Sequence, residues 1–341
     1  MATIQDVARE AGVSISTVSY ALSGKRSIKP DTRDRVLAAA KELGYLPNAS
    51  ARMLAANRSQ IFAVTAPLHP DTDHSAHMVF AMEVTKAARA HHYDTLLLVD
   101  NDASEGMRRS SATSLADGIV VLDVDAHDDR ADLARSISTP TVFIGIPADT
   151  TGLVCVDLDF AEAARAAVDA LVAAGRRKIG LISHPKITMR RESNFALRFH
   201  DGFVAHANAL ALDAPVAFPV ADRAHEAITA LLDESPHLDG LVLNTTAEVA
   251  ASVSAALAEN GRSVPSDVSV IAAGVTFSTE RMAVPFDTIP LDPQASCTVA
   301  VDLLASMVDE GTTPPEVTLL PPTYISRGSV TPSDTTAATQ A

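Results

Sequence analysis

The alternation of short apolar runs with helix-length segments through residues 60–330 restricts the possible folds strongly. Each run is a continuous stretch of aliphatic and β-branched residues, which is typical of parallel strands buried on both faces. The predicted strands fall into two successive series: Ile61–Ala66, Thr95–Val99, Gly118–Val124 and Thr141–Ile146, then Lys178–Ser183, Val216–Val220, Asp239–Leu243 and Val268–Ala273. Two such series predict an α/β body of two lobes, with a ligand cleft at the strand ends.

The first sixty residues have helical periodicity instead. Helices are predicted over about residues 4–11, 15–23 and 30–43, with Thr3 and Ser14 as caps and Pro30 at a first helical position. Gly12 makes a tight turn between the first two helices, and Val18 and Leu22 face back toward the first. Two short helices joined by such a turn form a helix-turn-helix, a fold whose second helix fits the major groove of DNA.

Charge is distributed unevenly along the chain. Residues 1–59 contain nine Lys and Arg against five Asp and Glu, whereas all 341 residues have a net charge of -15, so the remainder carries -19. A small basic head on an acidic body is the pattern expected when only the head meets phosphates.

Other sequence features exclude several protein classes. Cys155 and Cys297 form no CxxC pair, which predicts buried free thiols rather than a disulfide or a zinc site. The eleven histidines include His69, His74 and His77, and they are interpreted as solvated loop residues because no helical i, i+4 pair with a carboxylate is present. Without a signal peptide or a membrane-length apolar run, the expected location is cytoplasmic. No catalytic motif is found, so no enzyme, cofactor or metal is predicted.

The residue order of the head is specific. TIQDVAREAGVSISTVSYALSG, followed by TRDRVLAAAKELGYLPNASARML, closely resembles the DNA-binding head of the LacI/GalR (lactose-repressor) family over nearly all of residues 2–58. The resemblance implies a helix-turn-helix domain at residues 1–45 and a hinge at 46–59. It also implies that the hinge helix orders only on DNA, paired with its dimer mate in the minor groove.

The resemblance also implies roles for individual residues. The base-reading positions are Ile15, Ser16 and Tyr20, and the phosphate-contacting positions are Thr17 and Ser19, with Thr3 and Ser14 also within reach. In the hinge, the matched residues are Asn48, Arg52 and Leu54, with Leu54 as the apolar wedge of the minor groove. None of the three base-reading residues makes a bidentate contact to guanine, so readout is expected to depend on thymine methyl groups, a hydroxyl and groove shape.

The body keeps scattered phrases of the same family: DGI at 117–119, AGRRKIG at 174–180, DGF at 201–203, VPSDVSVI at 264–271 and SRGS at 326–329. They imply a periplasmic-binding-protein-like effector-binding and dimerisation domain at 60–330. The implied lobes are about 60–158 with 290–316 and 159–285 with 317–330, with crossings near 157–160, 285–290 and 316–323. Residues 331–341 are predicted to be a disordered tail. Because this tail lacks leucine heptads, a homodimer is expected.

The effector site departs from the family pattern. Sugar-binding relatives carry acidic residues where this chain has Gly145, Thr245 and the run 272–274, and their clamp arginine position is occupied by Phe199. Carboxylates and guanidinium groups supply the strong bonds that orient a polyol. The remaining candidate effector contacts are Asp159, His184, Arg198, Asn244 and Thr245, and a sugar or related metabolite is the expected effector.

Three functions are compatible with parts of this sequence pattern. A transporter's solute-binding protein shares the two-lobe body but has no DNA-binding head, and a sugar kinase with a regulatory head requires a phosphate-binding loop. The favoured function is a repressor that binds a palindromic DNA operator and responds to a small carbohydrate-like molecule. Whether such a regulator represses or activates depends on the position of its operator.

Overall fold

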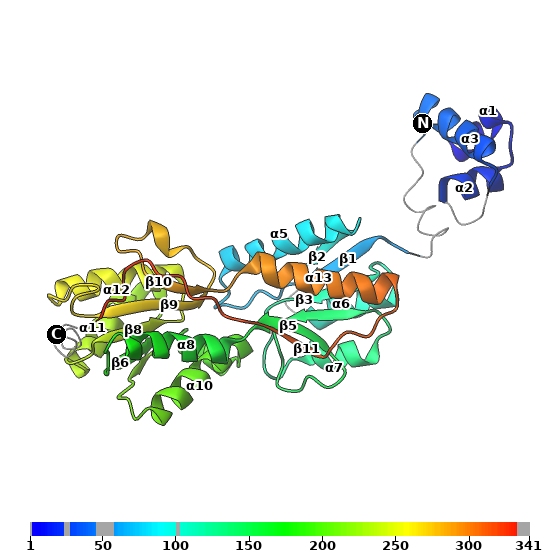
Figure 1. The fold of residues 1–341 in the computed structure, drawn as a ribbon. Coiled ribbons are helices and arrows are strands. Elements are labelled where there is room, and N and C mark those ends of the chain that lie inside the picture. The colour runs from blue at the N-terminus through cyan, green and yellow to red at the C-terminus, as the bar shows by residue number, and fades with distance from the viewer. Residues whose placement is uncertain (1, 24–27, 46–57, 100–102, 333–341) are drawn as a thin grey trace.

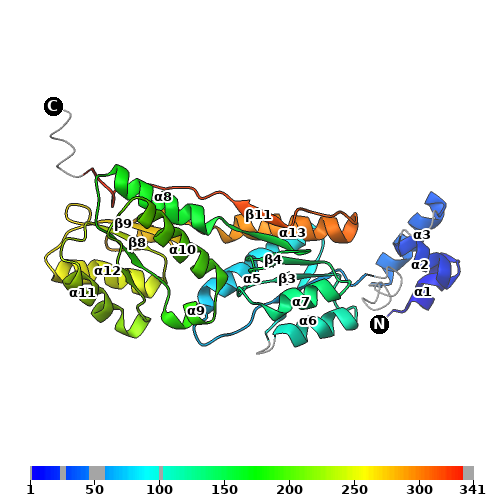
Figure 2. The same ribbon diagram turned by 90° about the horizontal axis from the view of Figure 1, so that it is seen from below.

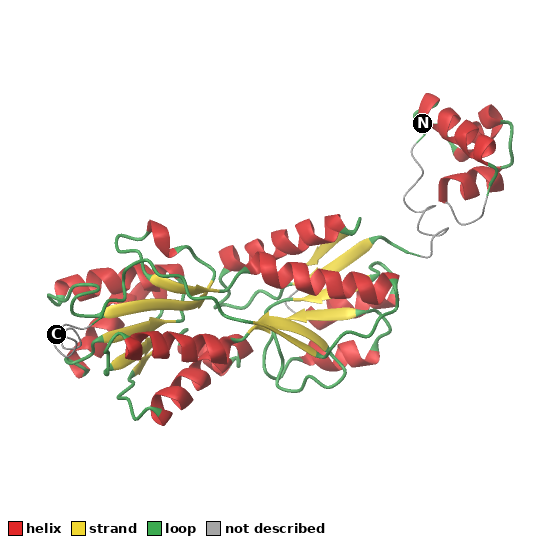
Figure 3. Cartoon of the chain, viewed as in Figure 1, coloured by secondary structure: helices red, strands yellow, loops and turns green. Residues whose placement is uncertain are grey.

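The computed structural model describes residues 2–23, 28–45, 58–99 and 103–332 (Figure 1). Two parallel sheets, each flanked by helices, form the body, and a separate group of helices forms the head (Figure 3). The predicted fold class, an α/β body with parallel sheets behind a helix-turn-helix head, is confirmed. Most of the hinge, with Asn48, Arg52 and Leu54, and the predicted disordered tail from residue 333 onward lie outside the described residues.

Three helices form the head: α1 (Ile4–Ala11), α2 (Ile15–Ser23) and α3 (Pro30–Glu42). Thr3 closes a capping box with Asp6 at the start of α1, and Gly12 ends that helix in the left-handed conformation, at φ 64°. Val7, Val18 and Val36, one from each helix, are fully buried in a shared apolar core. This small core fixes the angle at which α2 is presented.

The first lobe is built on a six-stranded parallel sheet with the order β11-β5-β4-β3-β1-β2. Its strands are β1 (Ile61–Thr65), β2 (Asp94–Leu98), β3 (Gly118–Val121), β4 (Thr141–Ile144), β5 (Val154–Leu158) and β11 (Val317–Leu320). Helices α5 (His74–Ala90) and α13 (Pro293–Asp309) cover one face, and α6 (Ala103–Ala112) and α7 (Asp129–Ser136) cover the other. Both faces are therefore buried, as continuous apolar strands require.

The second lobe is built on a five-stranded parallel sheet with the order β10-β9-β8-β6-β7. Its strands are β6 (Ile179–Ile182), β7 (Val216–Ala217), β8 (Gly240–Leu243), β9 (Ser269–Val275) and β10 (Asp287–Pro290). Helices α8 (Phe160–Ala173) and α10 (Asn194–Ala209) pack on one face (Figure 2), and α11 (Ala224–Glu234) and α12 (Ala247–Glu259) pack on the other. Shorter helical turns lie at α9 (Lys186–Arg190), η1 (Ala221–Arg223) and η2 (Thr279–Arg281).

The chain passes between the lobes after β5, after β10 and after β11. The lobe boundaries differ from the predicted ones by one strand in two places. Val317–Leu320, expected in the second lobe, pairs with β5 in the first sheet, and Asp287–Pro290, expected at a crossing, still pairs with β9 in the second. In both places the chain completes a strand along the edge of one sheet before it crosses.

Both cysteines are free and buried in the first lobe, as predicted. Cys155 lies in β5 and Cys297 in α13, and each contributes to an apolar cluster. They behave as small core side chains.

Candidate functional site

The N-terminus of α2 carries a group of hydroxyl side chains. The Ser14 hydroxyl accepts a hydrogen bond from the Thr17 backbone N–H at 3.1 Å and lies 2.8 Å from the hydroxyls of both Ser16 and Thr17. Ser14 and Ser16 are exposed, and Thr17 is half-buried. Hydroxyl groups at the positive end of a helix dipole are suited to bind a phosphate oxygen.

The outer face of α2 exposes two large side chains that folding alone does not explain. Ile15 is 47% exposed and Tyr20 is 38% exposed, whereas Val18 and Ala21 of the same helix are buried in the head core. Ser16 and Tyr20 are four residues apart and share one helix face, and Ser19 is half-buried beside them. This face therefore presents a methyl-rich side chain, a hydroxyl and a phenol to a partner.

Thr3, the other residue predicted to reach a phosphate, lies at the start of α1 rather than on α2. Its hydroxyl donates to the Asp6 carboxylate at 2.7 Å and accepts from the Asp6 N–H at 3.3 Å. Both interactions belong to the cap of α1, so the Thr3 hydroxyl is already engaged in the head structure.

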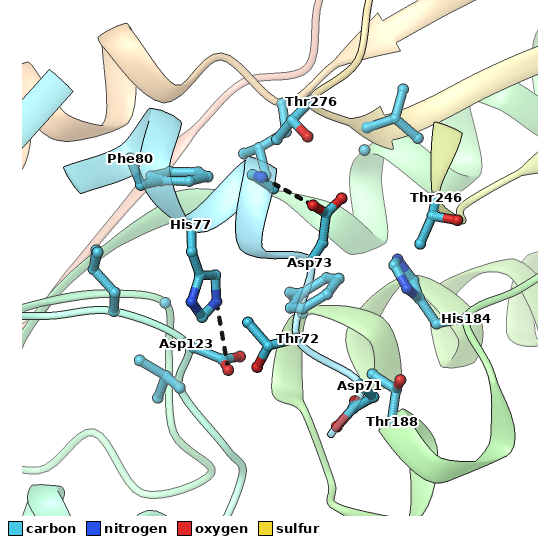
Figure 4. Close-up of a pocket in the computed structure, with 18 of the residues that line it drawn as sticks. Asp71, Thr72, Asp73, His77, Phe80, Asp123, His184, Thr188, Thr246 and Thr276 are labelled. Atoms are coloured by element: carbon cyan, nitrogen blue, oxygen red, sulfur yellow. Dashed lines mark hydrogen bonds and ion pairs between the residues drawn. The ribbon is translucent and has the colours of Figure 1, made fainter. Parts of the chain in front are cut away.

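A cavity of about 150 Å³ lies between the two lobes (Figure 4). The first lobe contributes the segment Asp71–Asp73, His77 and Phe80 of α5, and Asp123 after β3. The second lobe contributes a second set of lining residues, among them His184, Thr188, Arg191, Phe195, Thr245, Thr246, Thr276 and Phe277. The volume is comparable with cavities that admit a single small ring.

Only part of the predicted effector set reaches this cavity. His184 and Thr245 line it, whereas the lining does not include Asp159, Arg198 or Asn244. Asp159 instead caps α8 by accepting from the Glu162 N–H at 3.0 Å. Each of these three residues has a partner in the local structure, and its contact with an effector stays a prediction.

The side chains of Arg198 and Asn244 donate hydrogen bonds to groups near the cavity. The Arg198 guanidinium donates to Asp157 at 2.6 Å, and Asp157 itself lines the cavity. Burial raises the pKa of Asp157 to about 7, although the Arg198 charge opposes this rise. The Asn244 amide is fully buried and donates to the Ala273 carbonyl at 2.9 Å, where it joins the ends of β8 and β9.

Arg191 is the residue that sequence reasoning missed most clearly. It comes from the second lobe and contacts three carboxylates of the first: Asp71 at 3.4 Å, Asp123 at 3.3 Å and Asp125 at 2.6 Å. A backbone hydrogen bond between the lobes lies next to this cluster: the Asn194 N–H donates to the Val124 carbonyl at 3.1 Å. The lobes are held together at this edge of the cavity by an ion-pair cluster around Arg191.

The histidine interpretation also needs correction. His77 lies in α5, lines the cavity and has its Nε2 3.5 Å from the Asp123 carboxylate, and His69 lies 3.9 Å from the same carboxylate. These two are therefore partly buried members of the interlobe cluster and not solvated loop residues. Within the described ranges, no three His, Cys, Asp or Glu side chains are grouped as metal ligands would be.

Comparison with known families accounts for both parts of the chain. Residues 3–48 match the model of bacterial regulatory proteins of the LacI family, and residues 168–330 match a periplasmic binding protein-like domain. This chain belongs to the LacI family. Its head, α1 to α3, is thus the DNA-binding part of a transcription regulator, and the chain is not an enzyme.

Relatives of this LacI-family chain extend over most of its length. It is 28% identical to catabolite control protein A of Staphylococcus xylosus, over 82% of this chain and 83% of the relative. It is 27% identical to catabolite control protein A of Priestia megaterium, over 79% and 81%.

Solved structures share the fold of this LacI-family chain. A lac repressor dimer bound to operator and the anti-inducer ONPF superposes with a TM-score of 0.80 and 22% identity, covering 97% of this chain and 99% of that one. A complex of the transcriptional regulator CelR with cellobiose gives a TM-score of 0.67 and 22% identity, covering 96% and 100%. No helix among the described residues combines the length and hydrophobicity needed to cross a membrane.

Proposed function

We propose that this LacI-family chain is a homodimeric, cytoplasmic repressor that binds a palindromic operator and changes its operator affinity when a small carbohydrate-like molecule enters the interlobe cavity. The observation that carries this proposal is the exposed face of α2, with Ile15 and Tyr20 outside the head core. The cavity supplies the second element, because residues of both lobes line it. The proteins of similar fold include a lac repressor dimer bound to operator and the anti-inducer ONPF, and CelR in complex with cellobiose.

In this function, α2 enters the major groove of the operator. Ile15, Ser16 and Tyr20 would meet base edges, where the Ile15 side chain fits a thymine methyl group. Ser14, Thr17 and Ser19 would meet phosphates, and Thr3 would do so only by releasing its bond to Asp6. In the hinge, Asn48 and Arg52 would contact the DNA backbone, and Leu54 would enter the minor groove of the operator.

A homodimer is supported by an apolar face on α5. Met78 and Met82 are four residues apart and each 51% exposed, and Val79 between them is 45% exposed. Leu97 and Val99, at the end of the neighbouring strand β2, are exposed as well. An apolar patch of this kind is suited to pair with the same patch of a second copy about a two-fold axis.

Met82→Glu is therefore expected to dissociate the dimer, because two buried carboxylates would face each other across the two-fold axis. Sedimentation velocity of the full chain measures the change in mass. Leu210→Glu, which adds the same charge at an exposed site after α10, is the matched control. A dimer that persists in Met82→Glu would place the interface elsewhere.

Ligand coupling follows from the connections between the lobes. The cavity is bounded by both lobes, and the lobes are joined by three chain crossings and the Arg191 cluster. A ligand that binds one lobe arrangement more tightly than the other shifts the population between them, typically by about 1–3 kcal/mol. In a dimer this shift changes the separation of the two hinges, and with it the docking of the heads.

Selection of bound DNA from a random duplex library tests the proposal directly. We expect a palindrome of roughly 14–20 base pairs, because the half-sites of a symmetric dimer lie about one helical turn apart. Fluorescence anisotropy on that duplex, with and without a panel of sugars, then measures the effector response. An asymmetric selected site would contradict the dimer, and binding unchanged by every compound would contradict effector control.

Leu54→Ala is expected to weaken operator binding by about 1–3 kcal/mol, the usual value of one good contact in a site. The leucine would otherwise fill the unstacked central base step. Leu210→Ala removes an exposed leucine far from the hinge in sequence and serves as control. Normal affinity of Leu54→Ala, together with a loss in Tyr20→Ala, would show that no wedge operates in this protein.

A further inference from the structure

The lining of the interlobe cavity contains more acid than base. Asp71, Asp73, Asp123 and Asp157 line it, and Arg191 is the only Lys or Arg among the described lining residues. Asp157 is neutralised by Arg198, which lies outside the lining. Among the described lining residues, Asp71, Asp73 and Asp123 then stand against the single guanidinium of Arg191, and that guanidinium has its shortest carboxylate contact with a fourth, Asp125.

Histidines at the cavity do not offset this charge. Burial lowers the pKa of His184 to about 4, so its ring is neutral near neutral pH. Burial also lowers the pKa of His77, and the Asp123 carboxylate only partly opposes this. Asp125 has a pKa raised by burial to about 6 and is still mostly ionised at neutral pH. The cavity thus has excess negative charge.

Asp71 is the carboxylate with the least satisfied surroundings. Its side chain is 5% exposed, and neither oxygen accepts a hydrogen bond of normal geometry. Burial would raise the pKa of Asp71, but the nearby Thr188 hydroxyl and Arg191 outweigh it and lower the pKa, so the group is ionised. Asp71 thus has the Arg191 charge at 3.4 Å and the Thr188 hydroxyl nearby, but it accepts no hydrogen bond of normal geometry, which is costly for a buried carboxylate and leaves room for a further donor from a ligand.

A second observation comes from the opposite lobe. Thr245 is 3% exposed and lines the cavity, and its hydroxyl has no hydrogen-bond partner. Behind it, the buried Asn244 side-chain oxygen also lacks a donor. Figure 4 shows Asp71 and Asp73 of the first lobe and His184 and Thr246 of the second lobe around the same site. The unpartnered groups on both sides include acceptors, so a donor-rich ligand fits between them.

Aromatic side chains complete the lining. Phe80, Phe160, Phe195 and Phe277 line the cavity, and the rings of Phe160 and Phe195 lie 5.6 Å apart between centroids. The faces of aromatic rings attract cations, most strongly where water is excluded. Carboxylates beside phenyl rings are the setting in which a protein binds an organic ammonium group.

We propose that this cavity selects a small ligand with a protonated amine, and that Asp71 is the main ion-pair partner of that amine. The proposal rests on the proposed function, in which this cavity is the effector site. An ammonium group has three donors and no acceptor, which matches the oxygens of Asp71 and Thr245 that accept no hydrogen bond of normal geometry. Sugar phosphates and uronic acids are excluded by the same negative charge. Either an amino sugar or a short diamine has this chemistry.

Calorimetric titration of the full chain with glucosamine, putrescine, glucose, N-acetylglucosamine and glucuronate tests this inference. We expect glucosamine or putrescine to bind at least about tenfold more tightly than the uncharged and acidic compounds, the effect of one charge-assisted bond. Binding by glucosamine alone would identify an amino sugar, and binding by putrescine alone would identify a diamine. Equal or tighter binding of glucose, or no binding of either amine at millimolar concentration, would overturn the proposal.

Asp71→Asn keeps the shape of the side chain and is expected to remove most of the preference for the amine. Asp94→Asn, at an exposed acid paired with Arg89, is the matched control. Asp73→Asn provides a second variant if Asp71→Asn does not fold, and an unchanged amine preference in the folded variant contradicts the assignment. Operator binding is measured in parallel. Release of the operator by glucose alone would support the proposed effector-controlled regulator and contradict the amine-selective cavity. Amine binding without any change in operator affinity would support the amine-selective cavity and contradict effector control.

Discussion

Arg130→Met is expected to lower the free energy of unfolding of the first lobe by about 3–5 kcal/mol, the usual result of leaving a buried charge without its partner. Arg130 and Asp128 are 5% and 6% exposed. The guanidinium donates twice to Asp128, at 2.8 Å and 2.6 Å, and also to the carbonyls of Leu122 at 2.9 Å and Asp123 at 2.6 Å. Methionine fills a similar volume but supplies none of these donors.

The charge of Asp128 makes the stability contributed by this ion pair dependent on pH. Burial raises the pKa of Asp128, but Arg130 outweighs this and holds the pKa below the ordinary Asp value. The stability from this pair is therefore present above the ordinary pKa of an aspartate and is lost as the pH falls through the depressed value. Because Leu122, Asp123 and Val124 line the cavity, Arg130 also fixes one wall of the proposed effector site.

Urea denaturation followed by circular dichroism at neutral pH measures the effect. Arg135→Met is the matched control, since its partners Asp132 and Asp149 are largely exposed and such pairs contribute only about 0–1 kcal/mol. Asp128→Asn combined with Arg130→Met should recover part of the loss by removing the uncompensated charge. If Arg130→Met lost no more stability than Arg135→Met, the buried pair would have no structural importance.

The head could be predicted almost completely because its signals are local. Thr3, Gly12 and Ser14 each act within four residues of their own position, and all three have the predicted capping or turn geometry. Such signals need no knowledge of distant segments. The contacts of α2 with DNA stay predictions, because they depend on a partner.

Strands at the lobe crossings could not be found in the same way. β11 has alternating burial and exposes Val317 and Leu319, so it lacks a continuous apolar run. β10 has only four residues, which include Asp287 and Pro290. Both are strands because a neighbouring strand offers a free edge, and that edge exists only in the folded sheet.

The cavity was predicted least well, for a physical reason. Asp71, Asp123 and Arg191 are far apart in sequence, and they meet only when the two lobes approach each other. Conversely, Asp159 and Arg198 stand near the expected positions but satisfy a helix cap and a buried aspartate. Sequence position alone does not show which partner a polar side chain will choose.

A half-turn insertion between the half-sites of the selected operator is expected to reduce affinity by about three orders of magnitude, the lower limit of the usual gap between specific and non-specific binding. A symmetric dimer presents its two α2 helices to one face of the duplex, and half-sites about one turn apart lie on that face. Inserting about five base pairs turns one half-site to the opposite face, where the second head cannot dock.

Salt dependence distinguishes lost docking from a merely weaker contact. Each phosphate neutralised by Lys or Arg releases counterions, so the slope of log affinity against log salt reports the number of ionic contacts. Losing one of two basic heads should reduce this slope by up to about half on the inserted duplex. The same insertion placed outside the palindrome is the control and should change neither quantity. Equal affinity and slope on both duplexes would mean that each head binds independently, which would contradict the symmetric dimer.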